Sequence, residues 1–330
     1  MLLSRVKQNI EKYKMFSNVE TILIGISGGI DSSVLTQLVT LLAGREKIKV
    51  VLCHLNHSFR GSESDRDEAF VKNLAFEYGV LFESDKIDMP KVIATSKEGS
   101  AQSLSRGKRF DFFQGIASKY KTNSLFLAHN LDDLCETFLL RLFRGSGTLG
   151  LSAIKIKTKY KDLIVNRPLL TISRDDIGTY ARDFKIKFVE DSSNDGDKYD
   201  RNKLRHHLLP FIKQEFNANF INTIKNVTDL IKSDEDYFIS NIDKKLTEVV
   251  IEKSKKKYVL DLVRFNDMHL SFKTRVIRAV LENIIGSLYG ISFSNIQDII
   301  HIAASNDSKK EVVLLSGLKV KKINSRLVIE

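Results

Sequence analysis

Short apolar runs alternate with longer amphipathic runs between residues 19 and 167. The longer runs predict helices, of which the clearest span residues 34–42, 64–78 and 103–119. The short runs predict five buried strands, at residues 21–26, 47–54, 80–83, 124–128 and 163–166. Strands that alternate with helices favour an α/β, Rossmann-like fold with a doubly wound, mainly parallel sheet, which binds ligands at the carboxyl ends of its strands. Two polar stretches, 56–62 and 85–99, predict mobile lids.

The pattern changes after Pro210 and becomes strongly helical. Residues 219–245 carry apolar side chains at three- and four-residue spacings, which predicts one long amphipathic helix that links two domains. Beyond it, the pattern predicts a small strand at 258–260, helices at 271–285 and 292–303, and a hairpin over 311–329 with a turn at Ser316-Gly317. We therefore predict three parts: a catalytic domain at 1–215, a linker helix at 216–245 and a small α+β domain at 246–330.

The charge of the chain indicates the type of partner that it would suit. The chain of 330 residues has a net charge of +11 and an isoelectric point near 9.4, and residues 243–330 alone carry +6. A basic balance of this kind suits a polyanionic partner, although it is also found on ordinary solvated surfaces. The two cysteines, Cys53 and Cys135, are far apart, which predicts a reducing compartment, the cytoplasm, without a disulfide framework or a cysteine metal site. No apolar run has membrane-spanning length, and the amphipathic start does not read as a signal peptide.

The first predicted strand runs directly into a short loop rich in serine and glycine. Two glycines allow backbone N–H groups to approach a phosphate, and the helix that follows adds partial positive charge at its N-terminus. The loop lacks the Gly-Lys-Ser/Thr of a Walker loop and the G-x-G-x-x-G of a dinucleotide site. It resembles instead the PP-loop of N-type ATP pyrophosphatases, which implies cleavage between the α- and β-phosphates of ATP. A simpler interpretation is an ordinary capped turn between strand and helix. The loop consists of Ser27, Gly28, Gly29, Ile30, Asp31 and Ser32.

A second polar cluster follows the strand predicted at 124–128. On a helix that starts near Asn130, one imidazole and three carboxylates lie on or near one face. These side chains are His129, Asp132, Asp133 and Glu136. Acids also suit the first turn of any helix, and oxygen ligands suit Mg²⁺, so a simple helix start and a divalent metal site are both open interpretations. The predicted fold places this cluster beside the serine–glycine loop.

Several sequence blocks, in order along the chain from residue 21 to residue 210, together resemble the tRNA(Ile)-lysidine synthetase family. The resemblance rests on blocks that other PP-loop enzymes lack, so it is more specific than the first loop alone. Beyond residue 210 it extends only to length and pattern, and the chain resembles the shorter members of the family. The blocks are residues 26–32, 128–133, 136–137, 141–147, 167–170, 173–177, 190–194 and 201–206.

The resemblance implies a two-step reaction on the wobble cytidine of a tRNA(Ile) whose anticodon is CAU. ATP would adenylate the C2 oxygen and release pyrophosphate, and free lysine would then attack C2 and displace AMP. The partners implied are that tRNA, L-lysine, ATP and Mg²⁺. A homodimer and a tRNA-binding role for residues 246–330 are implied in the same way.

Matching to the family also implies a role for each site residue. Ser27, Gly28, Gly29, Ile30 and Ser32 would hold ATP and its pyrophosphate, and Asp31 would bind Mg²⁺. Asp133 and Glu136 would recognise lysine, and one of them could act as a base. His129 and Asp132 would line the adenylation site. Arg109 and Arg201 would lie near the ATP phosphates or the cytidine; without the resemblance each is more simply a surface or ion-pair residue.

The chain departs from the family pattern at a few positions, where it has Ala101-Gln102, Phe110 and Cys135. Gln102 keeps hydrogen bonding but carries no charge, and Cys135 reads as a small helix residue. Three alternatives share part of the pattern. A tRNA thiolase would need a cysteine pair or a cysteine-bound cluster, which the spacing of the cysteines does not supply. A small-molecule amidotransferase such as a guanylate synthetase shares only the first loop, and a non-catalytic tRNA-binding protein would not need the retained acids.

Overall fold

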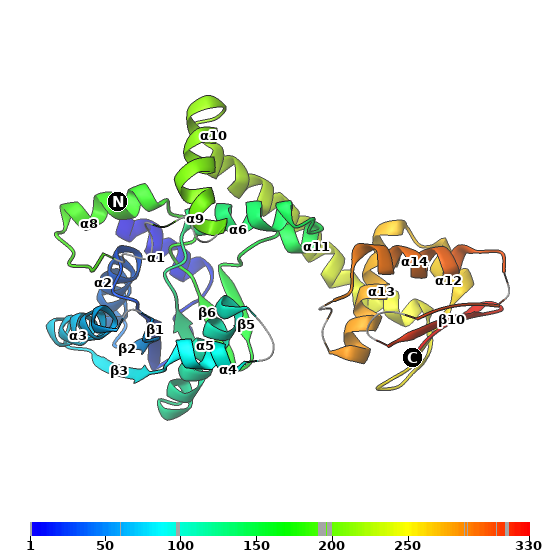
Figure 1. Ribbon diagram of the computed structural model, residues 1–330, viewed down its shortest axis with the longest axis horizontal. Coiled ribbons are helices and arrows are strands. Elements are labelled where there is room, and N and C mark those ends of the chain that lie inside the picture. The colour runs from blue at the N-terminus through cyan, green and yellow to red at the C-terminus, as the bar shows by residue number, and fades with distance from the viewer. Residues whose placement is uncertain are drawn as a thin grey trace. The chain divides into compact units, whose positions relative to one another are not determined.

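The computed structural model describes residues 2–59, 61–96, 100–190, 196, 200–286, 288, 290–307, 309–313 and 317–330. The chain divides into two compact units, Met1–Asp229 and Leu230–Glu330 (Figure 1). The long helix predicted as a linker is α11, Phe220–Val249, and it contributes residues to both units. No described helix is long and apolar enough to cross a membrane.

The first unit is built around a six-stranded sheet with the strand order β3-β2-β1-β4-β6-β5. All neighbouring strands pair in parallel except β5, which is antiparallel to β6 at the sheet edge. The predicted doubly wound, mainly parallel sheet is therefore confirmed. Only β5 was not predicted, because its polar sequence KTKY has no apolar run. The strands are β1 Thr21–Gly25, β2 Lys49–Asn56, β3 Leu81–Lys86, β4 Ser124–Phe126, β5 Lys157–Tyr160 and β6 Leu163–Asn166.

Helices cover both faces of this sheet, which explains the run of consecutive apolar residues, Ile22 to Ile24, in strand β1. In β1, Ile22 and Ile24 belong to the core on one face, whereas Leu23 belongs to the core on the other. Successive side chains of a strand point to opposite faces, so a strand buried on both sides needs apolar residues at every position. The first core contains buried residues of α1 Leu2–Lys12, α2 Ile30–Arg45, α3 Ser62–Glu77 and α8 Arg174–Asp183, and the second contains those of α5 Ala101–Lys119.

The remaining helices of the first unit are short or follow strand ends. They are α4 Met89–Thr95, α6 Leu131–Phe143, α7 Thr148–Leu151, α9 Asp200–Lys203 and α10 Leu209–Glu215, with a π-helical turn, Leu204–Leu208, between the last two. The stretch 85–99, which was predicted to be a loop able to act as a lid, consists largely of regular structure. Asp85 and Lys86 complete β3, and α4 is anchored by the fully buried Met89, while residues 97–99 lie outside the described residues.

The strand order places a topological switch point between β1 and β4. From β1 the chain proceeds to β2 and β3 on one side, and it returns to the other side of β1 as β4. In open α/β sheets the crevice at such a point, at the carboxyl ends of the strands, is where ligands bind. The serine–glycine loop follows β1 and the acidic cluster follows β4, so both sequence motifs meet at this crevice.

The second unit packs helices against a five-stranded antiparallel sheet with the order β7-β8-β11-β10-β9. The predicted hairpin over 311–329 is a three-stranded meander instead. Asn324, with φ +53°, adds a tight turn between β10 and β11, and the predicted turn residue Ser316 lies outside the described residues. The strands are β7 Val250–Lys253, β8 Tyr258–Asp261, β9 Lys309–Val313, β10 Lys319–Ile323 and β11 Arg326–Ile329, and the helices are α12 Leu262–Asp267, α13 Leu270–Ile285 and α14 Phe293–Ala304.

We predict that Gly25, the last residue of β1, is required for packing around the central strand. A Cβ atom there would lie 2.7 Å from Leu127 Cδ2 and 2.8 Å from Phe113 Cζ, so Gly25→Ala should lower the free energy of unfolding by about 1–3 kcal/mol. Gly44 in α2 is the matched control, because a Cβ meets nothing there and Gly44→Ala should stabilise the helix by about 0.5–1 kcal/mol. Urea unfolding of the full chain measures both changes. Equal stability of the two variants would contradict this account of Gly25.

Candidate functional site

The backbone of the serine–glycine loop adopts a conformation that only glycine fits. Gly28 has φ +94°, and a Cβ atom on it would lie 2.8 Å from Val189 Cγ2. The Val189 N–H donates a hydrogen bond of 3.0 Å to the Gly28 carbonyl, so a distant segment holds the loop from behind. The loop can therefore bring its backbone close to a ligand, as the sequence motif predicts.

Serine hydroxyls fix the loop from within. Ser32 Oγ donates to the Gly29 carbonyl at 2.9 Å and accepts from the Ser27 N–H at 3.3 Å. Gly29 is the N-cap of α2 and supplies no side-chain cap, so the first N–H groups of this helix are open to an anion. Ser27 is exposed at the mouth of the loop. The loop is thus preorganised to receive phosphate oxygens.

Asp31 lies in the first turn of α2, where it is half-buried. Burial raises the pKa of this carboxyl; the charge of Arg174 opposes the rise and the charge of Asp133 adds to it. Its Oδ1 atom is buried and accepts no hydrogen bond from a described residue. A carboxylate oxygen without a partner, beside a phosphate-binding loop, fits Mg²⁺, which is usually held by one or two carboxylates together with substrate phosphates.

The acidic cluster begins at the N-terminus of α6, where two side chains cap the helix reciprocally. Asn130 Oδ1 accepts from the Asp133 N–H, and Asp133 Oδ2 accepts from the Asn130 N–H, both at 3.0 Å. Asp132 Oδ2 accepts a 2.8 Å hydrogen bond from the backbone N–H of Arg174, so it joins α6 to the start of α8. Two of the three acids therefore also hold the local structure together.

Glu136 is fully buried and is paired with two arginines. Its Oε1 atom lies 2.7 Å from Arg205 Nη2, and its Oε2 atom lies 2.9 Å from Arg201 Nε. Burial raises the pKa of Glu136, and the two guanidinium groups lower it. Arg205 also lies 3.9 Å from Asp133 Oδ1, which links the two acids through one cation. Arg205 sits on the π-helical turn, a feature often found at functional sites.

His129 is held as a neutral imidazole. The Nε–H of the buried Arg167 donates to His129 Nδ1 at 3.3 Å, which requires that nitrogen to be unprotonated. Burial and, to a smaller extent, the charge of Arg167 lower the pKa of His129 to about 3, against the opposite effect of Asp133. The charge of Arg109 acts in the same direction, which places the exposed Arg109 near this imidazole.

The structure brings most of the predicted site residues together. The Asp133 carboxylate acts to raise the pKa of both Asp31 and His129 across the crevice, and Arg201 joins the group through Glu136. Arg205, Arg167 and Arg174 were not assigned as site residues, although they belong to blocks of the sequence resemblance. Their involvement arises from long-range pairing that spacing along the chain does not reveal. The block at 190–194 lies, after Glu190, outside the described residues.

The acids of α6 do not form a metal site by themselves. Among the described residues there is no group of three or more His, Cys, Asp and Glu side chains that could hold a metal ion. The alternative of a divalent metal centre at His129, Asp132, Asp133 and Glu136 is therefore not supported. A Mg²⁺ ion held by Asp31 together with substrate phosphates would be a different kind of site. The lack of a larger group of metal-binding side chains does not bear on it.

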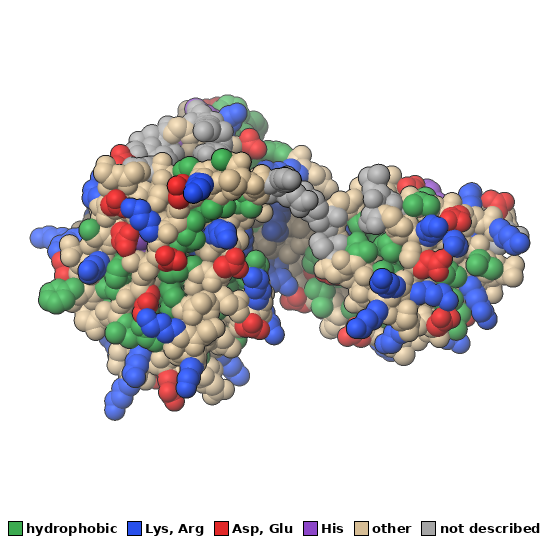
Figure 2. All heavy atoms as spheres, turned by 60° about the horizontal axis from the view of Figure 1, so that its bottom comes forward, with side chains coloured by type: hydrophobic (Ala, Val, Ile, Leu, Met, Phe, Trp, Pro, Cys, Tyr) green, Lys and Arg blue, Asp and Glu red, His purple; other side chains and the backbone are tan. Residues whose placement is uncertain are grey.

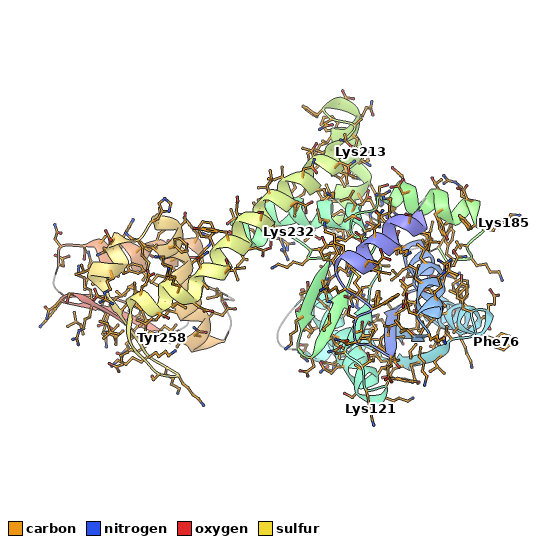
Figure 3. All side chains as sticks on the ribbon, turned by 180° about the vertical axis from the view of Figure 1, so that it is seen from behind. Phe76, Lys121, Lys185, Lys213, Lys232 and Tyr258 are labelled. Atoms are coloured by element: carbon orange, nitrogen blue, oxygen red, sulfur yellow. The ribbon has the colours of Figure 1, made fainter. Side chains whose placement is uncertain are left out.

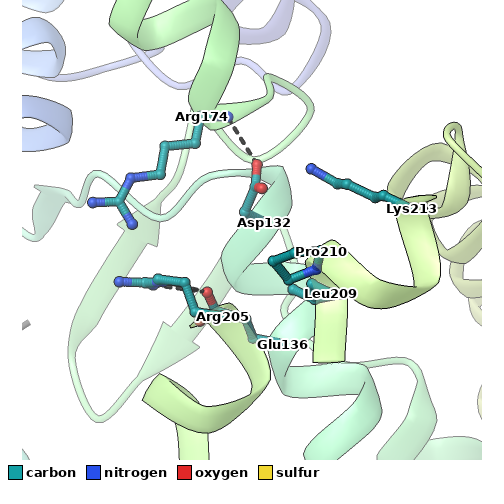
Figure 4. Close-up of a pocket in the computed structure, with 7 residues that line it drawn as sticks. All are labelled: Asp132, Glu136, Arg174, Arg205, Leu209, Pro210 and Lys213. Carbon is teal, nitrogen blue, oxygen red and sulfur yellow. Dashed lines mark hydrogen bonds and ion pairs between the residues drawn. The ribbon is translucent and has the colours of Figure 1, made fainter. Parts of the chain in front are cut away.

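A pocket of about 280 Å³ opens between α6, the start of α8 and the segment that leads into α10 (Figure 4). Figure 4 shows the Asp132 carboxylate on the Arg174 backbone and the Glu136 carboxylate against Arg205. Lys213 reaches towards the pocket from α10, whose place on the first unit is seen in Figure 3. The lining residues are Asp132, Glu136, Arg174, Arg205, Leu209, Pro210 and Lys213.

Comparisons with known proteins agree with this geometry. The model of the PP-loop domain family matches residues 2–212. The tRNA(Ile)-lysidine synthase of Clostridioides difficile is 30% identical over 330 residues, which are 100% of this chain and 70% of that protein. The tRNA(Ile)-lysidine synthase of Clostridium tetani is 32% identical over 304 residues, 92% of this chain and 64% of that protein. This chain thus spans roughly two thirds of the length of these relatives.

One solved structure shares the fold. It is the U34-tRNA thiolase NcsA from Methanococcus maripaludis with its 4Fe–4S cluster, with a TM-score of 0.55 and 15% identity. The match covers 69% of this chain and 78% of the thiolase. At this level of identity the likeness shows the fold alone.

We predict that His129 makes the stability of the chain depend on pH. Its folded pKa of about 3 lies below the ordinary value near 6.5, so between these values the unfolded chain binds a proton that the folded chain excludes. Stability should therefore fall as the pH falls from 6.5, and His129 should contribute up to about 1.4 kcal/mol per pH unit. Below about pH 5 the carboxylates also titrate, so the range from pH 6.5 to 5 is the most informative.

The test is urea unfolding of the full chain and of His129→Asn, whose amide oxygen can replace Nδ1 as the acceptor for Arg167. The slope of the unfolding free energy against pH should be shallower in the variant by up to about 1.4 kcal/mol per pH unit, which corresponds to the uptake of one proton on unfolding. His54 and His57, whose pKa values burial also lowers, account for the slope that remains. Identical slopes in the two proteins would show that His129 is not held neutral.

Proposed function

The chain belongs to the PP-loop family and, within it, to the tRNA(Ile)-lysidine synthases, and from this premise we propose that it converts a tRNA cytidine to lysidine with ATP and lysine. The substrate would be the wobble cytidine of a tRNA(Ile) with the anticodon CAU. One observation carries the proposal. The switch point of the sheet brings a phosphate-binding loop with Asp31 and a helix with two acids, Asp133 and Glu136, to the same crevice.

The proposed reaction has two steps. The loop with Asp31 serves the first step, and the acids of α6 serve the second. In the first, the C2 oxygen of cytidine attacks the α-phosphorus of ATP, and the bond from that phosphorus to the pyrophosphate oxygen breaks. In the second, the side-chain amine of lysine attacks C2, and the bond from C2 to its oxygen breaks. AMP leaves with the original C2 oxygen. The lysine ammonium gives up one proton before the attack and a second after the bond from nitrogen to C2 has formed, and a base accepts them. The products are lysidine, AMP and pyrophosphate.

The loop supports the first step by offering donors to the departing phosphates. The open N–H groups at the start of α2 and the exposed hydroxyl of Ser27 face the position of pyrophosphate in this proposal. Ser32, whose hydroxyl donates to the Gly29 carbonyl, holds the loop in shape. Asp31 would hold Mg²⁺, which supplies neutralisation of the phosphate charge when it is bound. Arg109, exposed beside the neutral His129, would place a positive charge at the same reacting region.

The acids of α6 support the second step by attracting and deprotonating an amine. Asp133 keeps part of its carboxylate accessible, with its side chain 20% exposed, whereas the side chain of Glu136 is 1% exposed. Because Arg201 and Arg205 neutralise Glu136, we assign the direct contact with the amine to Asp133. Glu136 then acts mainly by holding Arg205 beside Asp133. Both acids were predicted to bind lysine, and in this proposal they take different roles: Asp133 contacts the amine, and Glu136 positions Arg205.

The thiolase alternative is not favoured, although a tRNA thiolase shares the fold. The chain has two cysteines, Cys53 and Cys135, and both are buried. Burial raises the pKa of Cys135 to about 12 and raises that of Cys53 further, so neither thiol would ionise near neutral pH. The pair is also too small a set to bind an iron–sulfur cluster with four cysteines.

The second unit and the linker helix would bind the tRNA. The net charge of +6 over residues 243–330 suits the phosphate backbone, which dominates affinity for nucleic acid. Figure 2 shows lysine and arginine side chains on both units, mixed with acidic side chains. We propose that the contacts with the tRNA backbone are likewise distributed over many basic side chains. The homodimer implied by the family and the cytoplasmic location predicted from the two cysteines stay predictions, as do the boundaries at residues 215 and 245.

We predict that two carboxylate substitutions separate the two steps. Asp31→Asn should lower the release of pyrophosphate from ATP in the presence of tRNA about 100-fold or more, because the Mg²⁺ that would neutralise the phosphates loses its carboxylate ligand. Asp133→Asn keeps an oxygen for the helix cap but loses the charge, so it should release pyrophosphate normally and transfer lysine at least about tenfold more slowly. The measurements are pyrophosphate release without lysine and transfer of radiolabelled lysine into the tRNA.

Two controls accompany this experiment. Asp183→Asn removes an exposed acid at the end of α8 and should change neither step. Glu136→Gln should impair transfer as well, with a loss of stability, because it leaves two half-buried arginines without their charged partner. The division of roles is wrong if Asp31→Asn and Asp133→Asn lose the same step. Absence of lysine incorporation by the unmodified protein would refute the proposed function itself.

A further inference from the structure

The positive charge of the first unit is concentrated in two segments of the sequence. Residues 137–161 contain six lysines and arginines, residues 100–110 contain three, and neither segment contains an aspartate or a glutamate. Residues 1–229 as a whole have 35 basic and 28 acidic side chains, a net charge of +7, which is less than the charge of these two segments together. Because a local excess of one sign attracts a ligand of the opposite sign, these segments mark the part of the first unit that is best suited to an anion.

The two segments lie side by side in the structure. In α5, the ring of Phe110 lies 4.3 Å from that of Tyr160 in β5, centroid to centroid, and the guanidinium of Arg106 lies over the same Phe110 ring at 5.0 Å. In the other segment, Arg141 Nη1 donates a hydrogen bond of 2.6 Å to the Gly150 carbonyl. Burial lowers the pKa of Arg141, and the charge of Arg106 lowers it further, so cations of the two segments lie within electrostatic reach of each other. We call the lysines and arginines of residues 100–110 and 137–161 the basic surface.

The basic surface adjoins the reacting centre. Arg167, directly after β6, donates to His129, directly after β4, and the charge of Arg106 adds to the larger effect of burial in lowering the pKa of both side chains. Arg167 also donates to the Lys155 carbonyl at 2.8 Å, and the side chains of Lys155 and Lys159 are exposed. Since the strand order is β1-β4-β6-β5, the basic surface extends from His129 towards the sheet edge at β5, away from the serine–glycine loop after β1.

The arginines at the inner end of the basic surface lack a counter-charge. Arg106, Arg141 and the neighbouring Arg167 form no ion pair with a described residue, and the mutual repulsion of guanidinium groups opposes their gathering. The buried Arg167 and the half-buried Arg141 donate to backbone carbonyls, whereas Arg106 is exposed and its guanidinium contacts only the Phe110 ring among the described residues. Arg106 is therefore placed to contact a ligand, and the other two arginines add positive charge behind it.

We propose that the basic surface binds the phosphodiester backbone of the RNA next to the reacting cytidine, with Arg106 as a contact residue. This inference rests on the proposed function, and it extends RNA binding from the second unit to the first. A surface that continues from the reacting centre to the edge of the sheet matches an extended polyanion, whereas the triphosphate of ATP has the serine–glycine loop. A guanidinium suits a phosphate because two of its N–H groups can donate to two phosphate oxygens. Such contacts fix the register of the strand, so they would hold the cytidine in place at the crevice.

The first measurement is the affinity of the full chain for tRNA(Ile) at several salt concentrations. Arg106→Gln should weaken binding about tenfold and should make the dependence of log Kd on log salt shallower by about one, because one phosphate contact is lost. Arg106→Lys, which returns the charge, should restore the slope and most of the affinity. Lys72→Gln is the matched control, because Lys72 is exposed on α3, which packs against β2 and β3 at the other end of the sheet, and its loss should change neither quantity.

The second measurement identifies the phosphate. A methylphosphonate replaces one charged phosphate oxygen with a methyl group, and it is introduced in turn at each phosphate of the anticodon loop. In the unmodified protein, this change should weaken binding about tenfold at a phosphate beside the wobble cytidine. In Arg106→Gln the same change should have no further effect, because two substitutions that remove one contact are not additive.

Three outcomes would overturn the inference. Additive losses at every phosphate in Arg106→Gln would show that Arg106 contacts none of them. A raised KM for ATP in Arg106→Gln, with an unchanged affinity for the tRNA, would assign the basic surface to the nucleotide instead. If the unmodified protein transfers lysine and all variants bind the tRNA equally well, the inference fails while the proposed function stands. If the unmodified protein neither binds this tRNA nor transfers lysine, both fail together.

Discussion

The reciprocal hydrogen bonds between Asn130 and Asp133 determine where α6 begins, and the rest of the site depends on that position. Because the helix starts at the carboxyl end of β4, its first turn faces the loop that follows β1 across the switch point. The same start directs Asp132 to the backbone of α8 and places Glu136 one turn further inside the protein. One helix cap thus sets the distance between the serine–glycine loop and the acids of α6.

Charge balance explains why arginines accompany these acids. A buried carboxylate without a partner would be too costly, and Glu136 has two guanidinium partners. Its Oε1 atom accepts a hydrogen bond from Arg205, and its Oε2 atom forms an ion pair with Arg201 without a hydrogen bond. The pairing joins α6 to the segment with Arg201 and Arg205, which are far from it in sequence. Asp133 stays partly accessible because Arg205 reaches it only at 3.9 Å. Within one cluster, the protein therefore keeps one acid structural and leaves another open to a substrate.

The sequence predicts those parts of the molecule that depend on local patterns. The strand 21–26, the serine–glycine loop and the helix start at Asn130 follow from apolar runs, glycines and capping residues, and the structure has each of them. Strand β5 could not be predicted, because an antiparallel edge strand needs no apolar run. The pairing of Glu136 with Arg201 and Arg205, and the pocket at Lys213, depend on contacts between distant segments, which composition and spacing do not encode.

The central claim is that the two halves of the crevice act in succession on the C2 oxygen of one cytidine. Tracing that oxygen tests it directly, with a tRNA(Ile) that carries a heavy-oxygen label only at C2 of the wobble cytidine. After incubation with the protein, ATP and lysine, mass spectrometry should find the label in the phosphate of AMP and none in the modified nucleoside. Label that stays in the nucleoside while lysine is incorporated, or that appears in pyrophosphate, would contradict adenylation at C2.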